Sequence, residues 1–442
     1  MNAYIQFLNK LLLPISDFFI SGSYMKNLRL WRRYDQATEY ELAKIQRRKL
    51  NKILEHVSSN VPYYQGINSK DLKDFPILTK EILRAQTLDL ISTQHEISKL
   101  DKHHSSGSSG IQSFTYMTKK HTFYLRALQT HWWQWSGYRI GSKLLQFGIS
   151  QKRSALKQLK DFFYRCNYVK AFGLSNTDLD NILANFSTKK SIYIAGYPSV
   201  IQELAKRSRS SKINLDVNGI ICFGDKLFNH YEADIRNSFG KKTPIIDTYG
   251  CAEGLLMACK SDLESYYIMS PHVFLEIVDD NGKPVEDGII GNVLVTCLTN
   301  YAMPIIRYRL GDLAIMLPRQ HYPKQRKYNY PLLQKIVGRD TDVIKTTKGI
   351  TLNVHSFTGI FEYYQEIKQF KVVQHDLENL TIEYVFEEEH TSSEHQIIKE
   401  VSDKINDLTH QCLDIRFDKK QIIAPTASGK PQIIESHLKF HP

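Results

Sequence analysis

The chain has 442 residues, more than one ordinary hydrophobic core requires, so a large domain and a smaller one are expected. Hydrophobic residues make up 42% of the sequence and charged residues 24%, which excludes a largely disordered chain. The net charge is +12, but no nucleic-acid-binding motif accompanies it, so nucleic acid is not an expected partner. A solvated basic surface, or attraction to anionic lipid or a polyanionic substrate, remains open.

The six cysteines are scattered, and no pair has CxxC spacing. This favours a protein of the reducing cytoplasm over a zinc site or a disulfide framework. Near the start, the apolar stretch from Leu11 to Ile20 contains Pro14 and Asp17 and is about half as long as a membrane span. It does not have the uninterrupted apolar region of a signal peptide. Peripheral membrane association through an interfacial anchor remains open.

Residues 41–59 place apolar side chains along one helical face, and this helix must end before Pro62. From about Ser191 to Met316, short β-rich runs alternate with helix-like stretches at 198–208 and 228–239. This alternation predicts an α/β domain with much of its sheet buried.

The basic stretch 318–331 contains prolines and is interpreted as an excursion or a long hairpin. After residue 338 the pattern restarts with two strands and a long polar helix at 392–413, which predicts a small α+β unit. The expected domains are therefore 1–337 and a mobile C-terminal domain, 338–442.

The first chemical signal is a Ser/Gly loop, followed by Thr115 in a β-like run. Its glycines allow positive φ, so that successive N–H groups and hydroxyls can converge on a phosphate. A plain flexible loop is the alternative, and no Walker motif follows. The loop consists of Ser105, Ser106, Gly107, Ser108, Ser109 and Gly110.

Four further motifs follow in a fixed order. They are DTYGCAEG from Asp247 to Gly254, YRLGDL from Tyr308 to Leu313, GRDTDVIKTTKGI from Gly338 to Ile350, and TASGK ending at Lys430. With the Ser/Gly loop, this order resembles the adenylate-forming superfamily of acyl-CoA synthetases, adenylation domains and luciferases. Within it, the chain is most similar to the phenylacetate–CoA ligase branch and its CapK-like capsule-biosynthesis relatives.

The resemblance covers nearly the whole chain and implies a large multi-sheet N-terminal domain with a small C-terminal α+β domain. It also implies ATP, Mg²⁺ and CoA as cofactors. In the implied reaction a small carboxylic acid attacks the α-phosphorus of ATP and pyrophosphate leaves. Catalysis of such a step rests on positioning and electrostatic stabilisation.

The resemblance assigns a role to each motif. The Ser/Gly loop would hold the β- and γ-phosphates, and Glu253 would place Mg²⁺ unless it is a surface carboxylate. Tyr249 would pack on adenine or be an ordinary core tyrosine, and Asp312 would accept hydrogen bonds from both ribose hydroxyls. Arg339 would contact ribose or phosphate, with a structural salt bridge as the alternative. The remaining nucleotide-binding residues by resemblance are Gly224, Asp225, Asp247, Thr248 and Gly250.

Lys430 is the catalytic lysine by resemblance, bridging the incoming carboxylate and the α-phosphate. The chain departs from the family pattern after the Ser/Gly loop, where Ile111 and Gln112 replace the usual lysine and proline. Thr341 stands at the usual acidic hinge position, and Gln432 replaces a common basic residue. These departures concern how the small domain rotates.

The pocket for the acid is expected near Trp133, Tyr197, Phe223 and Thr248. Its aromatic residues suggest a flat apolar acid, although Trp132, Trp133 and Trp135 could also be core residues.

Three functions are compatible with these motifs. The first is an acid–CoA ligase, and the second is an adenylating ligase with an amine or hydroxyl acceptor on a surface (capsular) polysaccharide precursor. The third is a non-catalytic nucleotide-binding protein.

Overall fold

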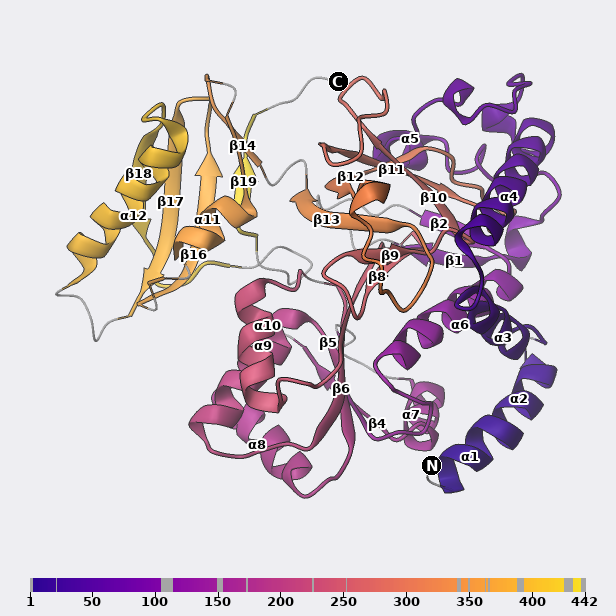
Figure 1. Ribbon diagram of the computed structural model, residues 1–442, viewed down its shortest axis with the longest axis horizontal. Coiled ribbons are helices and arrows are strands. Elements are labelled where there is room, and N and C mark those ends of the chain that lie inside the picture. The colour runs from indigo at the N-terminus through magenta and orange to yellow at the C-terminus, as the bar shows by residue number, and fades with distance from the viewer. Residues whose placement is uncertain are drawn as a thin grey trace.

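The computed structural model describes most of the chain and is shown in Figure 1. The described residues are 3–20, 22–104, 114–148, 154–171, 174–224, 226–251, 253–339, 343–348, 350–361, 363–364, 366–387, 393–424 and 432–438.

Helices form the N-terminal part of the chain. They are α1 (Ala3–Phe7), a π-helical turn (Leu8–Leu12), α2 (Leu13–Ile20), α3 (Tyr24–Tyr34) and α4 (Glu39–Asn60). A capping box between Thr38 and Glu41 starts α4, and the predicted apolar face buries Leu42 and Val57. The helix ends just before Pro62, which confirms the expected helix and its stop.

The centre of the molecule is a mixed sheet, with eleven strands in the described part of the chain, ordered β10-β11-β12-β13-β9-β8-β7-β6-β5-β3-β4. Its parallel portion comprises β3 (Leu144–Gly148), β4 (Cys166–Lys170), β5 (Ile192–Gly196), β6 (Val217–Cys222) and β7 (Ile245–Cys251). All residues of β5 are buried. The helices between these strands are α7 (Ala155–Phe163), α8 (Asn176–Ser187), α9 (Pro198–Ser210) and α10 (Asn229–Phe239). The predicted α/β alternation is therefore confirmed.

The rest of this sheet is antiparallel. It comprises β8 (Leu255–Lys260), β9 (Tyr266–Ile268), β10 (Val273–Val278), β11 (Ile290–Cys297), β12 (Tyr308–Met316) and β13 (Leu332–Arg339). The basic stretch 318–331 connects β12 to its antiparallel neighbour β13, so the long-hairpin interpretation is confirmed. The expected domain boundary at 337/338 falls inside β13 and stays a prediction.

A small hairpin and two helices complete the N-terminal part. Strand β1 (Asp101–His104) pairs with β2 (Phe114–Met117), so that the Ser/Gly loop lies in the connection between them. Helix α5 spans Lys80–Ala85, and α6 spans Lys119–Trp135. Short 3₁₀ turns occur at Pro62–Tyr64, Leu72–Asp74, Ile97–Lys99 and Arg319–His321.

The C-terminal unit has its own core. In its described part, β16 (Ile367–Gln374), β17 (Asn379–Phe386), β18 (Asp414–Lys419) and β19 (Ile434–Ser436) form a sheet in the order β18-β17-β16-β19. Helices α11 (Val354–Phe361) and α12 (Glu394–Thr409) contribute to the same core, beside the short pair β14 (Val343–Lys345) and β15 (Thr351–Asn353). Figure 1 shows this unit at the left of the view, beside the large sheet.

The observed α/β architecture with a smaller α+β unit confirms the predicted fold class. Phe228, which precedes α10, is buried in the core of the C-terminal unit and so joins the two parts of the chain. Among the described residues, no helix is both long and apolar enough to cross a membrane.

Candidate functional site

Three neighbouring parallel strands bring predicted residues to one edge of the sheet. Tyr197 directly follows β5 and Phe223 directly follows β6, while Thr248 and Tyr249 lie in the last half of β7 and Glu253 comes just after it. Ligands of open α/β sheets bind outside the carboxyl ends of the strands because the loops there converge. The hydroxyl of Thr248 donates a 3.0 Å hydrogen bond to the carbonyl oxygen of Cys222, which ties β7 to β6 at this edge.

Tyr249 connects this edge to the antiparallel strands. It is 8% exposed, and its hydroxyl donates a 2.7 Å hydrogen bond to Oδ2 of Asp312 on β12. Burial and the neighbouring carboxylate of Asp312 raise the pKa of Tyr249 well above its usual value, so the phenol stays protonated. The structure thus brings together two predicted nucleotide-binding residues. Their contacts with adenine and ribose stay predictions.

Glu253 is buried behind the same edge. The hydroxyl of Tyr308, at the start of β12, lies 3.5 Å from Oε1 of Glu253. Burial, with a contribution from Glu253, raises the pKa of Tyr308, which keeps this phenol a hydrogen-bond donor. Glu253 is therefore not the exposed surface carboxylate that the alternative interpretation required.

The described flank of the Ser/Gly loop contacts Glu253. The hydroxyl of Thr115 on β2 donates to the backbone oxygen of Glu253 at 3.3 Å. Strand β2, which follows the loop, thus contacts the backbone of the predicted Mg²⁺ ligand. Ser105 to Gly110 themselves, Asp225 and Lys430 lie outside the described residues.

Arg339 lies at the end of β13, opposite Asp312. The two residues are direct partners in the antiparallel register of β12 and β13. Lys226 fixes the same strand from the other side, because its ammonium donates to the backbone oxygens of Ile336 at 3.0 Å and Val337 at 2.7 Å. The chain then passes through Gly338, whose φ of 150° favours glycine.

The expected acid pocket brings aromatic rings together from three elements. The half-buried rings of Trp133 and Phe223 are parallel, with centroids 6.4 Å apart, and Tyr197 meets Phe223 edge-on at 5.9 Å. Gly224 has φ 78°, and a Cβ there would lie 2.7 Å from the Tyr197 ring, so no larger residue fits without a shift. A flat apolar group could stack in such surroundings.

The other two tryptophans of the segment belong to the core. Trp132 and Trp135 are 1% and 7% exposed and pack in the same hydrophobic cluster as Tyr267 and Tyr330. The core alternative thus holds for these two, while Trp133 faces Phe223. A helix places successive side chains about 100° apart, and Trp133 is accordingly only half-buried at the margin of the same cluster.

Several polar residues at the site were not among the predicted site residues. They are Tyr308, Lys226 and Tyr266, which hydrogen-bonds the carboxylate of Asp247. The register of β7, β8 and β9 places Tyr266 next to Asp247, whereas Tyr308 meets Glu253, just after β7, from a strand that does not pair with β7. Tyr308 could have been noticed, since it opens the YRLGDL motif that also contains Asp312.

The donor set suits a magnesium ion held mainly by substrate. Within the described ranges, no group of three or more His, Cys, Asp or Glu side chains lies where it could hold a metal. Mg²⁺ in nucleotide sites is usually bound by one or two carboxylates together with phosphates and water, and the role of Glu253 as such a carboxylate stays a prediction.

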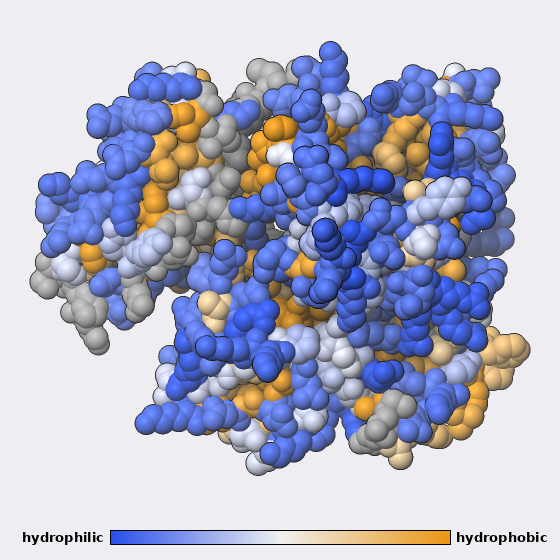
Figure 2. Space-filling model, in the orientation of Figure 1, coloured by the Kyte–Doolittle hydropathy of each residue, from blue (hydrophilic) through white to orange (hydrophobic). Residues whose placement is uncertain are grey.

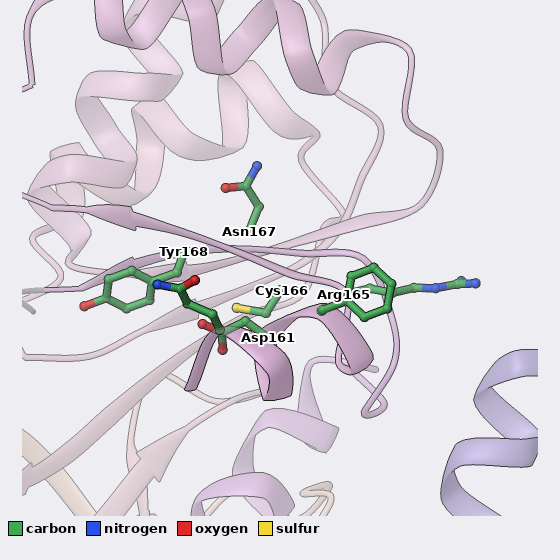
Figure 3. A pocket seen from close by; sticks show the side chains of 7 residues that line it. Asp161, Arg165, Cys166, Asn167 and Tyr168 are labelled. Carbon is green, nitrogen blue, oxygen red and sulfur yellow. The ribbon is translucent and has the colours of Figure 1, made fainter. Parts of the chain in front are cut away.

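A shallow groove lies elsewhere, between α7 and β4. It is lined by Asp161, Phe162, Arg165, Cys166 and Tyr168, among others (Figure 3). None of the residues predicted to bind nucleotide or acid lines it, and β4 is the edge strand furthest from the antiparallel part. The groove is therefore separate from the candidate site.

Sequence comparison finds relatives over part of the chain. The phenylacetate-coenzyme A ligase of Pseudomonas putida is 32% identical over 144 residues, 31% of this chain and 30% of that protein. The indoleacetate–lysine synthetase of Pseudomonas savastanoi is 27% identical over 126 residues, 28% of this chain and 29% of that protein. The matches thus span less than a third of these relatives' own length. No protein-family model matches the chain.

Structure comparison extends the likeness to nearly the whole chain. A 2-hydroxyisobutyryl-CoA ligase in the postadenylation state, bound to an acyl adenylate, gives a TM-score of 0.72 at 16% identity and covers 92% of this chain and 91% of its own. The same ligase in the thioesterification state gives 0.58 at 16% identity, covering 92% of each chain. The fold is that of the adenylate-forming ligases, and the resemblance to this superfamily is confirmed.

Proposed function

We propose that the chain is an AMP-forming acid ligase, which activates a carboxylic acid with ATP and then transfers the acyl group to coenzyme A. One observation supports the proposal most directly. Tyr249 hydrogen-bonds Asp312, and Tyr308 and Thr115 both contact Glu253, so the two predicted carboxylates and the flank of the Ser/Gly loop lie at one edge of the sheet. The phenylacetate-coenzyme A ligase relatives and the CoA-ligase neighbour support this reaction class.

Each group has a task set by its chemistry. Asp312 would accept the ribose hydroxyls, with Tyr249 holding its carboxylate in place. The backbone N–H groups of the Ser/Gly loop would hold the β- and γ-phosphates. Mg²⁺, bound at Glu253, would neutralise phosphate charge. Lys430 would stabilise the charge that develops as the acid oxygen bonds to the α-phosphorus and the bond to pyrophosphate breaks.

The acid itself would lie against Trp133, Phe223 and Tyr197. Stacked aromatic rings favour an apolar acid with a flat group, such as an aryl acid. The small C-terminal domain, from residue 338, would turn between the two half-reactions. The better overlay on the postadenylation state than on the thioesterification state supports an arrangement suited to the first of them.

A second candidate keeps the adenylation but replaces CoA by an amine or hydroxyl acceptor. The similarity to an indoleacetate–lysine synthetase, whose name specifies an amino acid acceptor, favours it. A surface-polysaccharide precursor would be such an acceptor, and the net charge of +12 would suit an acidic one. A cytoplasmic location is proposed for either reaction, supported by six free cysteines.

The test is acid-dependent exchange between pyrophosphate and ATP across a panel of aryl, arylacetic and short aliphatic acids. We expect exchange with at least one acid, abolished by Glu253→Gln and kept by Glu264→Gln, whose carboxylate is exposed on the nearby surface. The mass of the product formed with CoA, with lysine or with a hydroxyl acceptor then separates the two candidates. ATP binding without exchange for any acid would favour a non-catalytic nucleotide-binding protein.

A further inference from the structure

The N-terminal helices turn a row of large apolar side chains toward solvent. Phe7, Leu11 and Ile15 recur every four residues, and Phe18 and Phe19 extend the row by one turn. Phe18 is 78% exposed and Phe19 80%, which is unusual for side chains of this size. The N-terminal apolar face consists of Phe7, Leu11, Ile15, Phe18, Phe19 and Ile20. Figure 2 shows apolar residues gathered at the lower right, where Figure 1 places α1 and α2.

The opposite side of the same helices is fixed to the body of the protein. Leu8 and Leu13 are buried in the cluster that contains Trp31. The Asn9 amide donates a 2.8 Å hydrogen bond to the backbone oxygen of Ile140. The N-terminal apolar face is therefore held in a defined position on the body of the protein.

Helix α7 adds a second apolar surface next to the first. Leu159, Phe162 and Phe163 are 54%, 77% and 41% exposed. The hydroxyl of Tyr4 donates to the backbone oxygen of Phe163 at 2.6 Å, and the Arg165 guanidinium stacks over the Tyr4 ring at 4.1 Å. These contacts join α7 to α1, so the two apolar surfaces lie on neighbouring helices.

The charges around this surface have one sign. Residues 3–34 carry five basic side chains and a single acid, Asp17. Both carboxylate oxygens of Asp17 accept backbone N–H groups at the start of α3, from Tyr24 and Met25. On α7, Lys157 and Lys160 are exposed whereas the acid of that helix, Asp161, is buried. Exposed apolar side chains and an excess of exposed basic side chains thus lie on the same helices.

We propose that this surface docks on a bilayer of anionic phospholipid, with the helices from Ala3 to Ile20 lying in the plane of the interface. Interfacial helices combine an apolar face with basic flanks, and the lipid headgroups attract the basic side chains. A second copy of the chain fits less well, because a two-fold contact through this surface would bring the basic side chains of the two copies together. The proposal does not depend on the proposed catalytic function.

The test is cosedimentation of the full chain with vesicles of phosphatidylcholine alone or with added phosphatidylglycerol. We expect binding to the anionic vesicles at least about tenfold stronger than to the neutral ones. Binding should fall when salt is raised from about 0.1 M to 1 M, which shortens the screening length from about 10 Å to about 3 Å. Hydrogen exchange of the wild-type protein should slow in α1, α2 and α7 when these vesicles are added.

Matched variants distinguish binding through this surface from nonspecific binding by exposed apolar side chains. Phe18→Ser with Phe162→Ser should lower vesicle binding by about tenfold or more. Leu88→Ser with Ile422→Ser removes two equally exposed apolar side chains elsewhere, 66% and 74% exposed, and should not. Lys10→Glu with Lys157→Glu should likewise weaken binding to anionic vesicles.

Three results would overturn the proposal. One is wild-type protein that stays in the supernatant with anionic vesicles at low salt. Another is an equal loss of binding in the surface variant and in the Leu88/Ile422 control. The third is a wild-type protein that binds no vesicles but is a dimer in light scattering, where Phe18→Ser with Phe162→Ser dissociates the dimer. That result would assign the surface to a second copy.

Discussion

The phenol of Tyr249 donates its hydrogen bond to the carboxylate of Asp312, 63 positions further along the chain. This bond links β7 of the parallel portion to β12 of the antiparallel portion, across the edge where the nucleotide is proposed to bind. Because the pKa of Tyr249 is raised, the bond persists throughout the neutral and mildly alkaline range. Asp312 is therefore held in one orientation by the residue proposed to lie under the adenine.

Tyr249→Phe tests this link. The ring is kept and the donor is lost, so we expect the free energy of unfolding to fall by about 0.5–1.5 kcal/mol, with ATP affinity reduced to a similar extent. Tyr384→Phe is the matched control, because Tyr384 donates a 2.9 Å hydrogen bond to Glu394 in the C-terminal unit. Denaturant unfolding and calorimetry with ATP measure both quantities. An equal loss of ATP affinity in the control would contradict the link.

Asp312→Ala removes the proposed ribose acceptor itself. Two ribose hydroxyls would lose a charged partner, so ATP binding should weaken by roughly 1.5–3 kcal/mol. The same substitution should affect AMP as much as ATP, because the two nucleotides share the ribose. Unchanged affinity for both nucleotides in a folded variant would remove the assignment.

Two residues after β6 hold the junction with the C-terminal unit. Lys226 binds the backbone oxygens of Ile336 and Val337, and Phe228 is buried in the C-terminal core. Lys226→Met should free the end of β13, so we expect faster proteolysis at residues 338–342 and a larger radius of gyration in X-ray scattering. Lys206→Met is the control, since Lys206 is exposed on α9. No change in either measurement would show that the junction is held by other contacts.

A buried histidine pair makes stability depend on pH. Burial lowers the pKa of His121 to about 3 and holds that of His272 well below its usual value; His103 and Lys49 add to the effect on His121, and His121 and Lys49 to that on His272. Between pH 6.5 and 3 the unfolded chain binds protons that the folded protein does not. Stability should therefore fall as pH drops below 6.5, by about 1.4 kcal/mol per pH unit for each histidine.

His272→Asn should make the unfolding free energy less dependent on pH between 7 and 5. Asparagine keeps a polar group near Thr299, whose hydroxyl lies 2.7 Å from Nδ1 of His272. His395→Asn, on the exposed face of α12, should leave this pH dependence as it is. The same slope in all three proteins would mean that other groups control acid sensitivity.

Most of the fold could be predicted because it follows from local patterns in the sequence. Short β-rich runs located the strands from β5 to β7, a period-3.6 apolar pattern located the helix α4, and Pro62 marked the end of that helix. Side-chain pairs across strands could not be predicted, since the register of β12 against β13 is irregular and includes shifts. The bond from Tyr249 to Asp312 and the contacts of Lys226 depend on that register. The motifs could thus identify residues of the site but not the hydrogen-bond partners of those residues.

Substitution of Lys430 should affect the two half-reactions differently. Its proposed role is to stabilise charge that develops only while the acid attacks the α-phosphate, and losing one such donor typically costs about 10²–10³ in rate, roughly 3–4 kcal/mol. Lys430→Ala should therefore abolish pyrophosphate exchange while still passing an acyl group from supplied acyl adenylate to the acceptor. Lys430→Arg should rescue poorly, because a broad planar guanidinium replaces a compact ammonium between two oxyanions. Rapid-quench measurements of each half-reaction provide the comparison. Equal losses in both half-reactions would give the lysine a different role, and full exchange activity in the alanine variant would exclude it from the adenylation step.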